Sequence, residues 1–307
     1  MIAKHPVPIS SLLTDAEFKR AMNQRLAISL IVGQGVFFLV ETAMVHHLGG
    51  RVPIIQLAFL RAAAGVAIAT AIAWRSSASL RTQQLGLHLF RGGVALAYLW
   101  VLMYSFGTLP FADATALSYT QVAYIAVFSV LILRESMVLR RWIASAVCVI
   151  GALLIAQPSF HDWNVSYFFV LAGTSLNGLA FVLNRYAQRH DNEVTTMFYV
   201  NLVSAIGGLC LMSASGAPIE IPDATTSFLL SGVFLFGPLG VYLGVVAVKH
   251  AETSTLAPYT LVRLVIGVLS GFFLFHEAPA LASIFGAILI LISCALAVPA
   301  RASATAH

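Results

Sequence analysis

Apolar segments of about twenty residues recur along almost the whole chain, and they constrain its fold more than any other feature. A helix needs about 20 mostly apolar residues to cross a bilayer, whose hydrocarbon cannot pair free backbone polar groups. The chain is 59% hydrophobic and 9% charged, against about 25% charged residues in soluble domains. We therefore predict an all-α polytopic membrane protein with ten transmembrane helices, at residues 26–45, 54–74, 85–108, 111–133, 140–157, 165–187, 195–213, 226–248, 255–275 and 279–299.

The motifs of the common enzyme and cofactor classes are absent from this sequence. It contains no HExxH, GxSxG, phosphate-binding loop or CxxC pair. Cys148, Cys210 and Cys294 lie inside apolar runs without metal-like spacing, and we interpret them as small core residues. The sequence thus predicts a protein that is not an enzyme and that uses no metal and no cofactor.

The basic residues predict how the helices are oriented. Cytoplasmic loops of membrane proteins carry an excess of Lys and Arg. With the N-terminus in the cytoplasm, all but three of the 17 Lys and Arg residues fall on the cytoplasmic side; the exceptions are Arg51, Arg61 and Arg263. This predicts a multi-pass protein of the bacterial inner membrane with residues 1–25 and 300–307 as cytoplasmic tails. Within the first tail, the stretch SSLLTDAEFKRAMNQR is either a short interfacial helix or solvated chain.

A short pattern occurs twice and divides the chain into two halves. Residues 112–117 (ADATAL) align with residues 251–256 (AETSTL), and Glu135 aligns with Glu277 near the end of each copy. The copies belong to the fourth and ninth apolar segments. Because each half then has five helices, an odd number, residues 165–299 must be inverted relative to residues 26–157. Inverted repeats are a recurring transporter design, with the substrate site near the midplane between the halves.

These segments resemble a known family. The stretch RGGVALAYLWVLMYSFGTLPFADATALSYT, the following LILRESMVLRRWIASAVCVIGALLIAQP and the later APYTLVRLVIGVLSGFFLFHEAP are similar to the EamA branch of the drug/metabolite transporter superfamily. Arg61 occupies a position where these proteins commonly carry an arginine. The resemblance implies a two-repeat carrier of small metabolites, often an exporter of amino acids. Family members usually have a proline early in the fourth helix, and SYTQVAYIAV has none, so the family's substrates do not carry over directly.

Three ionisable residues lie within apolar segments: Glu41, Arg61 and Arg263. A charge at the centre of a membrane helix costs about 2.5–3.5 kcal/mol on insertion scales, so it needs a partner, water or a function. Glu41 is a candidate substrate-ammonium or proton site, and the alternative is a buried salt bridge to Arg61 or Arg263. For Arg61, a structural role by pairing or by reaching the outer interface competes with a place in the pathway.

Amide side chains extend the candidate pathway. Gln34 precedes Glu41 by two helical turns, so both project from one face of the first helix. Gln121 and Asn177 would be left without hydrogen-bond partners if they faced lipid. Their alternative role is hydrogen bonding between helices.

Two tyrosines complete the candidate set. Tyr124 lies one turn beyond Gln121, and Tyr259 lies one turn before the arginine of the ninth segment. Pro238 and Pro258 are predicted to bend or break their helices, which would free backbone groups near a cavity. The predicted substrate or proton pathway comprises Glu41, Gln34, Arg61, Gln121, Tyr124, Asn177, Tyr259 and Arg263.

The sequence therefore predicts a membrane transporter of small metabolites that works by alternating access. The expected substrates are amino acid-like or related polar or cationic compounds, and the expected direction is export. A passive channel or pore is the alternative, followed by a membrane-embedded enzyme. Expected partners are a small-molecule substrate and the lipid bilayer, with no nucleic acid. A homodimer is left open, as is the choice between proton coupling through Glu41 and transport driven by the substrate gradient.

Overall fold

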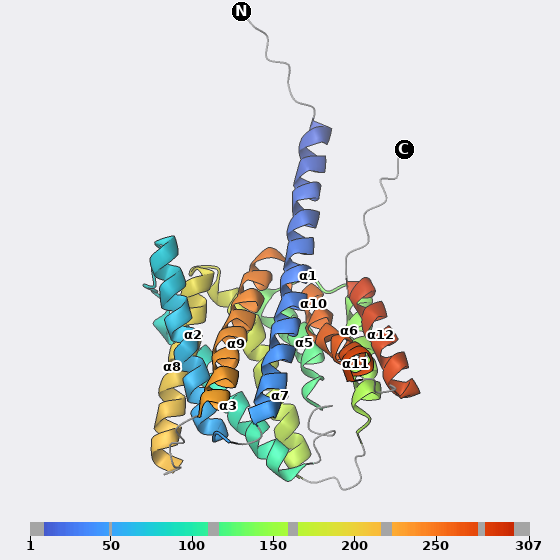
Figure 1. Cartoon of the computed structure of the whole chain (residues 1–307). Helices are drawn as coiled ribbons and strands as arrows, with labels where there is room; N and C mark the ends of the chain where they lie inside the picture. The colour runs from blue at the N-terminus through green and yellow to red at the C-terminus, as the bar shows by residue number, and fades with distance from the viewer. Residues whose placement is uncertain are drawn as a thin grey trace, which may run out of the picture.

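The structure is a computed structural model that describes residues 9–48, 51–109, 117–158, 165–215, 223–275 and 280–297. These residues form a bundle of helices and contain no strand (Figure 1). The elements are α1 (Ile9–Leu48), α2 (Ile54–Ser76), α3 (Leu85–Thr108), α5 (Gln121–Leu133), α6 (Leu139–Ala156), α7 (Val165–Ala187), α8 (Glu193–Ser215), α9 (Ala224–His250), α10 (Thr253–Leu256), the 3-10 helix η1 (Ala257–Leu261), α11 (Val262–Phe275) and α12 (Leu281–Ala297).

Each predicted apolar segment contains at least one helix, and the predicted first span, 26–45, agrees with the apolar span at Asn23–Val45. Helix α1 begins at Ile9 and continues without a break into the first apolar segment. The N-terminal stretch is therefore neither a separate interfacial helix nor irregular chain, and it extends α1 beyond the rest of the bundle (Figure 1). In the fourth segment, residues 117 and 118 are helical, a turn follows at Tyr119 and Thr120, and α5 then continues from Gln121 to Leu133. Residues 110–116, which hold part of the first repeat motif, lie outside the described residues, as does Glu277.

The two prolines predicted to disturb helices behave differently. Pro258 lies in η1, which interrupts the ninth segment between α10 and α11. Proline has no N–H to donate and clashes with the preceding helical turn, so a short 3-10 segment is a natural result. Pro238 instead lies inside α9, which remains one helix from Ala224 to His250. A break of the helix is confirmed at Pro258, whereas at Pro238 the helix is not broken, which leaves only the predicted bend.

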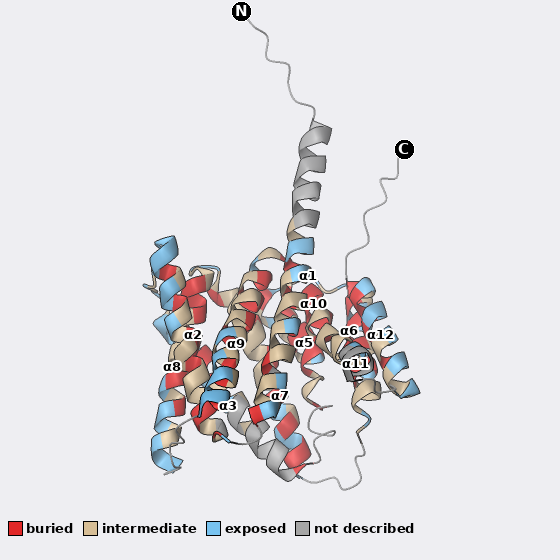
Figure 2. Cartoon of the chain, in the orientation of Figure 1, coloured by how far each residue is buried: buried red, intermediate tan, exposed pale blue. Residues whose placement is uncertain are grey.

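The outer surface of the bundle is apolar. Figure 2 shows exposed residues on the outward sides of α8 and α12, and large exposed side chains elsewhere include Trp74, Phe168 and Phe228. Among the described helices, six are long and apolar enough to cross a membrane, and α5, α12 and the segment Thr253–Leu269 are shorter apolar helices. An apolar surface of this extent suits contact with hydrocarbon rather than with water.

The cysteines show how the membrane changes the meaning of an apolar run. Cys148 and Cys294 are buried in the protein, as predicted, whereas Cys210 is exposed on α8. The prediction for Cys210 is wrong because a helix in a membrane is apolar on its lipid-facing side as well as on its inner side.

Four helix pairs form the most extensive contacts between the two halves of the chain. Helix α1 packs on α9, α2 on α8, α3 on α7 and α6 on α12. The contact of α6 with α12 is very tight at the backbone, because Gly151 and Gly286 face each other there: a Cβ added at Gly151 would lie 2.7 Å from the carbonyl oxygen of Gly286. Small residues at a crossing let membrane helices approach closely. Helices α1, α2, α3, α5, α7, α8, α9, η1 and α11 all contribute residues to a space between the halves.

Candidate functional site

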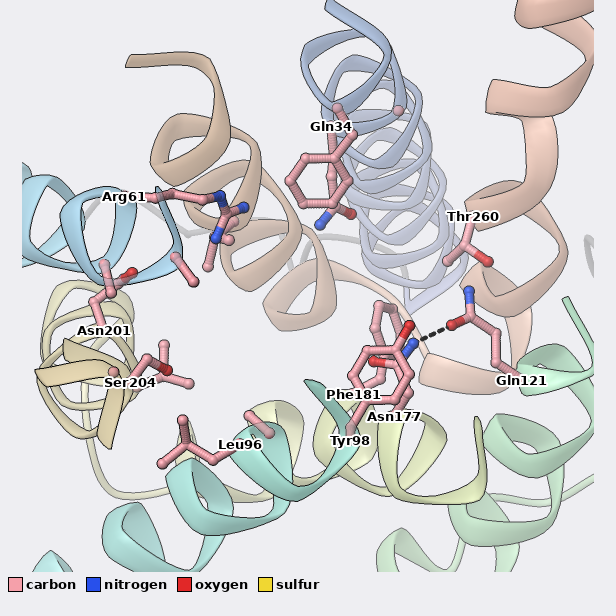
Figure 3. Close-up of a pocket in the computed structure, with 18 of the residues that line it drawn as sticks. Gln34, Arg61, Leu96, Tyr98, Gln121, Asn177, Phe181, Asn201, Ser204 and Thr260 are labelled. Atoms are coloured by element: carbon pink, nitrogen blue, oxygen red, sulfur yellow. Dashed lines mark hydrogen bonds between the residues drawn. The ribbon is translucent and has the colours of Figure 1, made fainter. Parts of the chain in front are cut away.

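A cavity of about 630 Å³ lies between the two halves. Most of its wall is apolar and a few polar groups interrupt it, which is the usual character of small-molecule sites of about 300–1,000 Å³. Figure 3 shows Arg61 and Asn201 on one side of this space and Gln121 and Thr260 on the other. The lining residues are Ile31, Gln34, Gly35, Phe38, Ile55, Ala58, Arg61, Ala62, Ala95, Leu96, Tyr98, Gln121, Asn177, Phe181, Val200, Asn201, Ser204, Gly208, Leu211, Val241, Thr260 and Arg263.

Five of the eight predicted pathway residues line this cavity. They are the three amides and the two intramembrane arginines: Gln34, Gln121, Asn177, Arg61 and Arg263. They come from α1, α5, α7, α2 and α11, so helices far apart in the sequence bring them together. These five polar side chains therefore lie inside the bundle, around the cavity, as polar groups within apolar segments are expected to do.

Glu41 does not line the cavity but bonds a residue that does. Arg61 donates from Nε to Glu41 Oε1, and from Nη2 to Glu41 Oε2 at 3.3 Å. The Glu41 side chain is 12% exposed and that of Arg61 is 30% exposed. The structure thus contains the salt bridge between Glu41 and Arg61 that was one of the two alternatives for this acid, and the pair is close to neutral as a unit.

The two predicted tyrosines are not among the residues that line the cavity. Tyr259 donates a hydrogen bond from its hydroxyl to the carbonyl oxygen of Cys294 in α12, at 2.8 Å. The Cβ of Tyr124 packs against α7 at Gly178. In a 3-10 helix, residues three apart share a face. Thr260 therefore takes the position beside Arg263 that α-helical spacing would have given to Tyr259.

One hydrogen bond crosses the cavity wall between the halves. Asn177 Nδ2 donates to Gln121 Oε1, which joins α7 to α5 (Figure 3). The two residues hydrogen-bond between helices and also line the cavity. Hydrogen bonding between helices and a place in the substrate pathway are therefore compatible roles for these two amides.

A repeated pattern on the cavity wall was missed in the sequence. Gln34-Gly35 is followed by Phe38, and 143 positions later Asn177-Gly178 is followed by Phe181. Both copies have an amide and a phenylalanine that line the cavity. The glycine of each copy packs against a helix of the opposite half. A Cβ added at Gly35 would lie 3.2 Å from Arg263 Cβ in α11, and one added at Gly178 would lie 2.8 Å from Tyr124 Cβ in α5.

The same spacing connects α2 and α8. Arg61 and Ser204 are also 143 positions apart, as are Ala58 and Asn201, and all four line the cavity. Asn201 and Ser204 were not predicted as site residues. The constant spacing is the signal that could have found them, because a residue that lines a cavity in one repeat has an equivalent in the other.

A second set of contacts between the halves lies at one end of the bundle. This end, which we call the basic end, is formed by residues 75–91, 134–141, 185–196 and 249–254. Glu135 Oε1 accepts from the backbone N–H of Thr253 at 2.8 Å, and its Oε2 accepts from the N–H of Ser254 at 3.0 Å and from the Ser254 hydroxyl at 2.6 Å. Glu135 therefore caps α10, as an acid near helix N-terminal amides is expected to do.

Charged neighbours reinforce this cap. Arg141 forms an ion pair with Glu252 and donates to the Ser254 hydroxyl at 3.3 Å. We call Glu135, Arg141, Glu252, Thr253 and Ser254 the Glu135 cluster. It connects the loop after α5 in the first half to the start of α10 in the second.

Further contacts between the halves lie at the same end. Asp191 Oδ2 accepts from the Thr82 hydroxyl at 2.7 Å and lies 2.8 Å from His88 Nε2. Arg91, which is fully buried, donates to Asn184 Oδ1 and to the carbonyl oxygen of Thr196. Between α5, α7 and α9 this end also has a polar pocket of about 570 Å³, lined by Leu133, Arg134, Glu135, Ser136, Arg185, Gln188, Arg189, Lys249 and Glu252.

Comparison with known proteins places the chain in a family. The model of the EamA-like transporter family matches residues 25–157 and 164–298. An S-adenosylmethionine uptake transporter of Rickettsia bellii is 24% identical over 88% of this chain and 94% of its own length. A riboflavin transporter of Vibrio cholerae is 28% identical over 71% of this chain and 72% of its own length. A pseudopaline exporter of Pseudomonas aeruginosa is 24% identical over 84% of this chain and 90% of its own length.

The fold is shared with a solved structure. A crystal structure matches with a TM-score of 0.76 at 15% identity, covering 90% of this chain and 96% of that chain. The family match spans both halves of the chain, and the apolar outer surface agrees with a multi-pass membrane protein. This chain belongs to the EamA-like transporter family.

Proposed function

We propose that this chain transports small amino acid-like or related polar metabolites across the bacterial inner membrane by alternating access, in the direction of export. The observation that carries the proposal is a cavity between the two halves together with contacts between the halves at one end. In such carriers the two repeats move against each other around a fixed central site. The cavity is then the substrate site, and the basic end is the side that is closed in this structure.

The packing of the helices supports two inverted repeats of five, at residues 26–157 and 165–299. Matching the helices of the two halves in chain order pairs α1 with α7, α2 with α8 and α3 with α9. The contact of α1 with α9 then corresponds to the contact of α7 with α3, and both contacts are present. The contact of α5 with α7 likewise becomes that of α11 with α1, which is also present. The spacing of 143 residues between equivalent cavity positions agrees with the same exchange.

The basic residues support a cytoplasmic location for the basic end and for both termini. Arg75, Arg81, Arg134, Arg140 and Arg189 lie there, whereas Arg51 lies at the opposite end. Cytoplasmic loops favour such residues. The proposed state is therefore closed toward the cytoplasm.

The relatives support a small metabolite as substrate and differ in direction. One takes up S-adenosylmethionine and one exports pseudopaline, by their names. Export is proposed here from the resemblance to exporters within the family. Proton coupling would act at the pair of Glu41 and Arg61, where protonation of the acid would release the arginine toward the cavity.

Counterflow in proteoliposomes tests the proposal. Vesicles containing the purified protein are loaded with an unlabelled compound, and uptake of the labelled form is measured for several amino acids, S-adenosylmethionine and riboflavin. We expect saturable uptake that an internal load of the same compound accelerates, because a carrier exchanges substrate faster than it returns empty. Flux that neither saturates nor responds to the internal load would favour a pore, and no flux for any compound would contradict the proposed substrate range.

A further inference from the structure

Arg263 differs from the other arginine of the cavity in having no counter-ion among the residues that the structure describes. It lies in the first turn of α11 and lines the cavity with Thr260, one 3-10 turn before it. Within the part of the chain that the structure describes, its guanidinium takes part in no hydrogen bond and no ion pair.

The cavity therefore has one uncompensated positive charge. Arg61 is bonded to Glu41 through two of its nitrogens, so this pair adds no net charge. Among the described lining residues there is no acid to balance Arg263. A lone guanidinium at membrane depth is costly unless water or a ligand compensates it. Because its described lining residues include the unpaired Arg263 and no acid, the cavity favours an anionic group over a cationic one.

We propose that Arg263 binds a carboxylate group of the transported substrate. The proposal rests on the use of this cavity as the transport site and narrows the substrate class: the compound carries a carboxylate, and purely cationic compounds are excluded. A guanidinium presents parallel N–H donors that match the two oxygens of a carboxylate. Thr260 and Gln121, which Figure 3 shows on the same side of the cavity, supply a hydroxyl and an amide group to its wall.

The charge balance favours a monoanionic group. A carboxylate group neutralises the charge of Arg263, and in a zwitterionic amino acid the ammonium group is then the one remaining charge. A dianionic phosphate ester would leave one negative charge in a mostly apolar space, where an unpaired charge is unfavourable. The apolar part of the wall, which includes Ile31, Phe38 and Phe181, is suited to the rest of a hydrophobic or aromatic amino acid.

The test compares each carboxylate with its carboxamide on the purified full-length protein. The probes are L-phenylalanine, L-methionine and L-leucine, each against L-phenylalaninamide, L-methioninamide and L-leucinamide, and affinity is read from the rise in unfolding temperature with ligand concentration. For at least one pair we expect the wild type to bind the carboxylate at least about tenfold more tightly, since hydrogen bonds to charged groups are the stronger ones.

The variants assign this preference to one residue. Arg263→Gln should reduce the ratio of carboxylate to carboxamide affinity to about twofold or less, because amide N–H donors remain but the charge is lost. Arg263→Lys should give an intermediate ratio, because it keeps the charge without the parallel donors. Arg75→Gln, an exposed position at the end of α2, should retain the wild-type ratio.

Three results overturn the inference. They are a wild-type ratio near one in every pair, a ratio that neither Arg263 variant changes, and no binding by any of the carboxylates. The wild-type comparison stands even if the variants do not fold. Because none of these measurements uses transport, saturable counterflow with another compound would leave the proposed carrier function intact while the inference fails.

Discussion

Glu41→Gln should destabilise the folded protein by about 2 kcal/mol and strongly reduce transport. The substitution removes the negative charge that Arg61 bonds through two nitrogens and leaves a guanidinium without a counter-ion between α1 and α2. Removing one partner of a buried pair costs about 3–5 kcal/mol, and the figure is lowered here because Arg61 is 30% exposed. The measurement is thermal and chemical unfolding in detergent, with counterflow at saturating substrate.

A double variant separates loss of the pair from loss of the acid. In Glu41→Gln combined with Arg61→Gln, two neutral amides replace the ion pair, and most of the lost stability should return. Wild-type stability of Glu41→Gln alone would show that the pair does not matter for the fold. Transport adds a second reading: if Glu41→Gln transports at the wild-type rate with the same pH dependence, Glu41 is not a proton-coupling site.

Glu135→Ala should open the basic end of the bundle. Glu135 accepts three hydrogen bonds from Thr253 and Ser254 across the two halves. Charge-assisted hydrogen bonds of this kind contribute about 1.5–3 kcal/mol, so removing them should shift the equilibrium between closed and open states by at least about tenfold. The cavity would then be open to solvent at the basic end for a larger fraction of the time. Because alternating access also requires a state that is closed at this end, the transport rate should fall.

A cysteine in the cavity reports this opening. With Cys148, Cys210 and Cys294 replaced by serine, Ser204→Cys provides a single thiol on the cavity wall. Its alkylation by a membrane-impermeant maleimide added at the basic end should be at least about tenfold faster with Glu135→Ala. Arg81→Gln, an exposed position in a loop at the same end, serves as the control and should leave the rate unchanged. Equal alkylation rates with and without the Glu135→Ala substitution would mean that this cluster does not close the pathway.

The sequence predicts the membrane helices and the polar cavity residues for one physical reason. Amides and arginines inside apolar segments cannot be left against lipid, so Gln34, Gln121, Asn177 and Arg263 had to face the interior. That rule names the residues but not the partner of each. Whether Glu41 would pair with Arg61 or with Arg263 depended on how α1, α2 and α11 pack, which no local pattern specifies.

Two other parts of the site depend on long-range geometry. Tyr259 was assigned to the pathway from α-helical spacing, but Pro258 makes the local helix 3-10 and turns Thr260 inward instead. The repeated pattern places Glu135 near the end of its first copy but does not show which groups bond the carboxylate. The groups that donate to it belong to α10, beginning 118 residues further along the chain, and this contact exists only because the halves fold against each other.

Cross-linking the Glu135 cluster is the most direct test of alternating access. Glu135→Cys and Ser254→Cys, in the background without native cysteines, place two thiols where the wild-type side chains lie within hydrogen-bond distance, and a short bis-methanethiosulfonate reagent joins them. If transport requires the two halves to separate at the basic end, the cross-linked protein should show no counterflow, and reduction should restore it. Undiminished counterflow in the fully cross-linked protein would contradict the account.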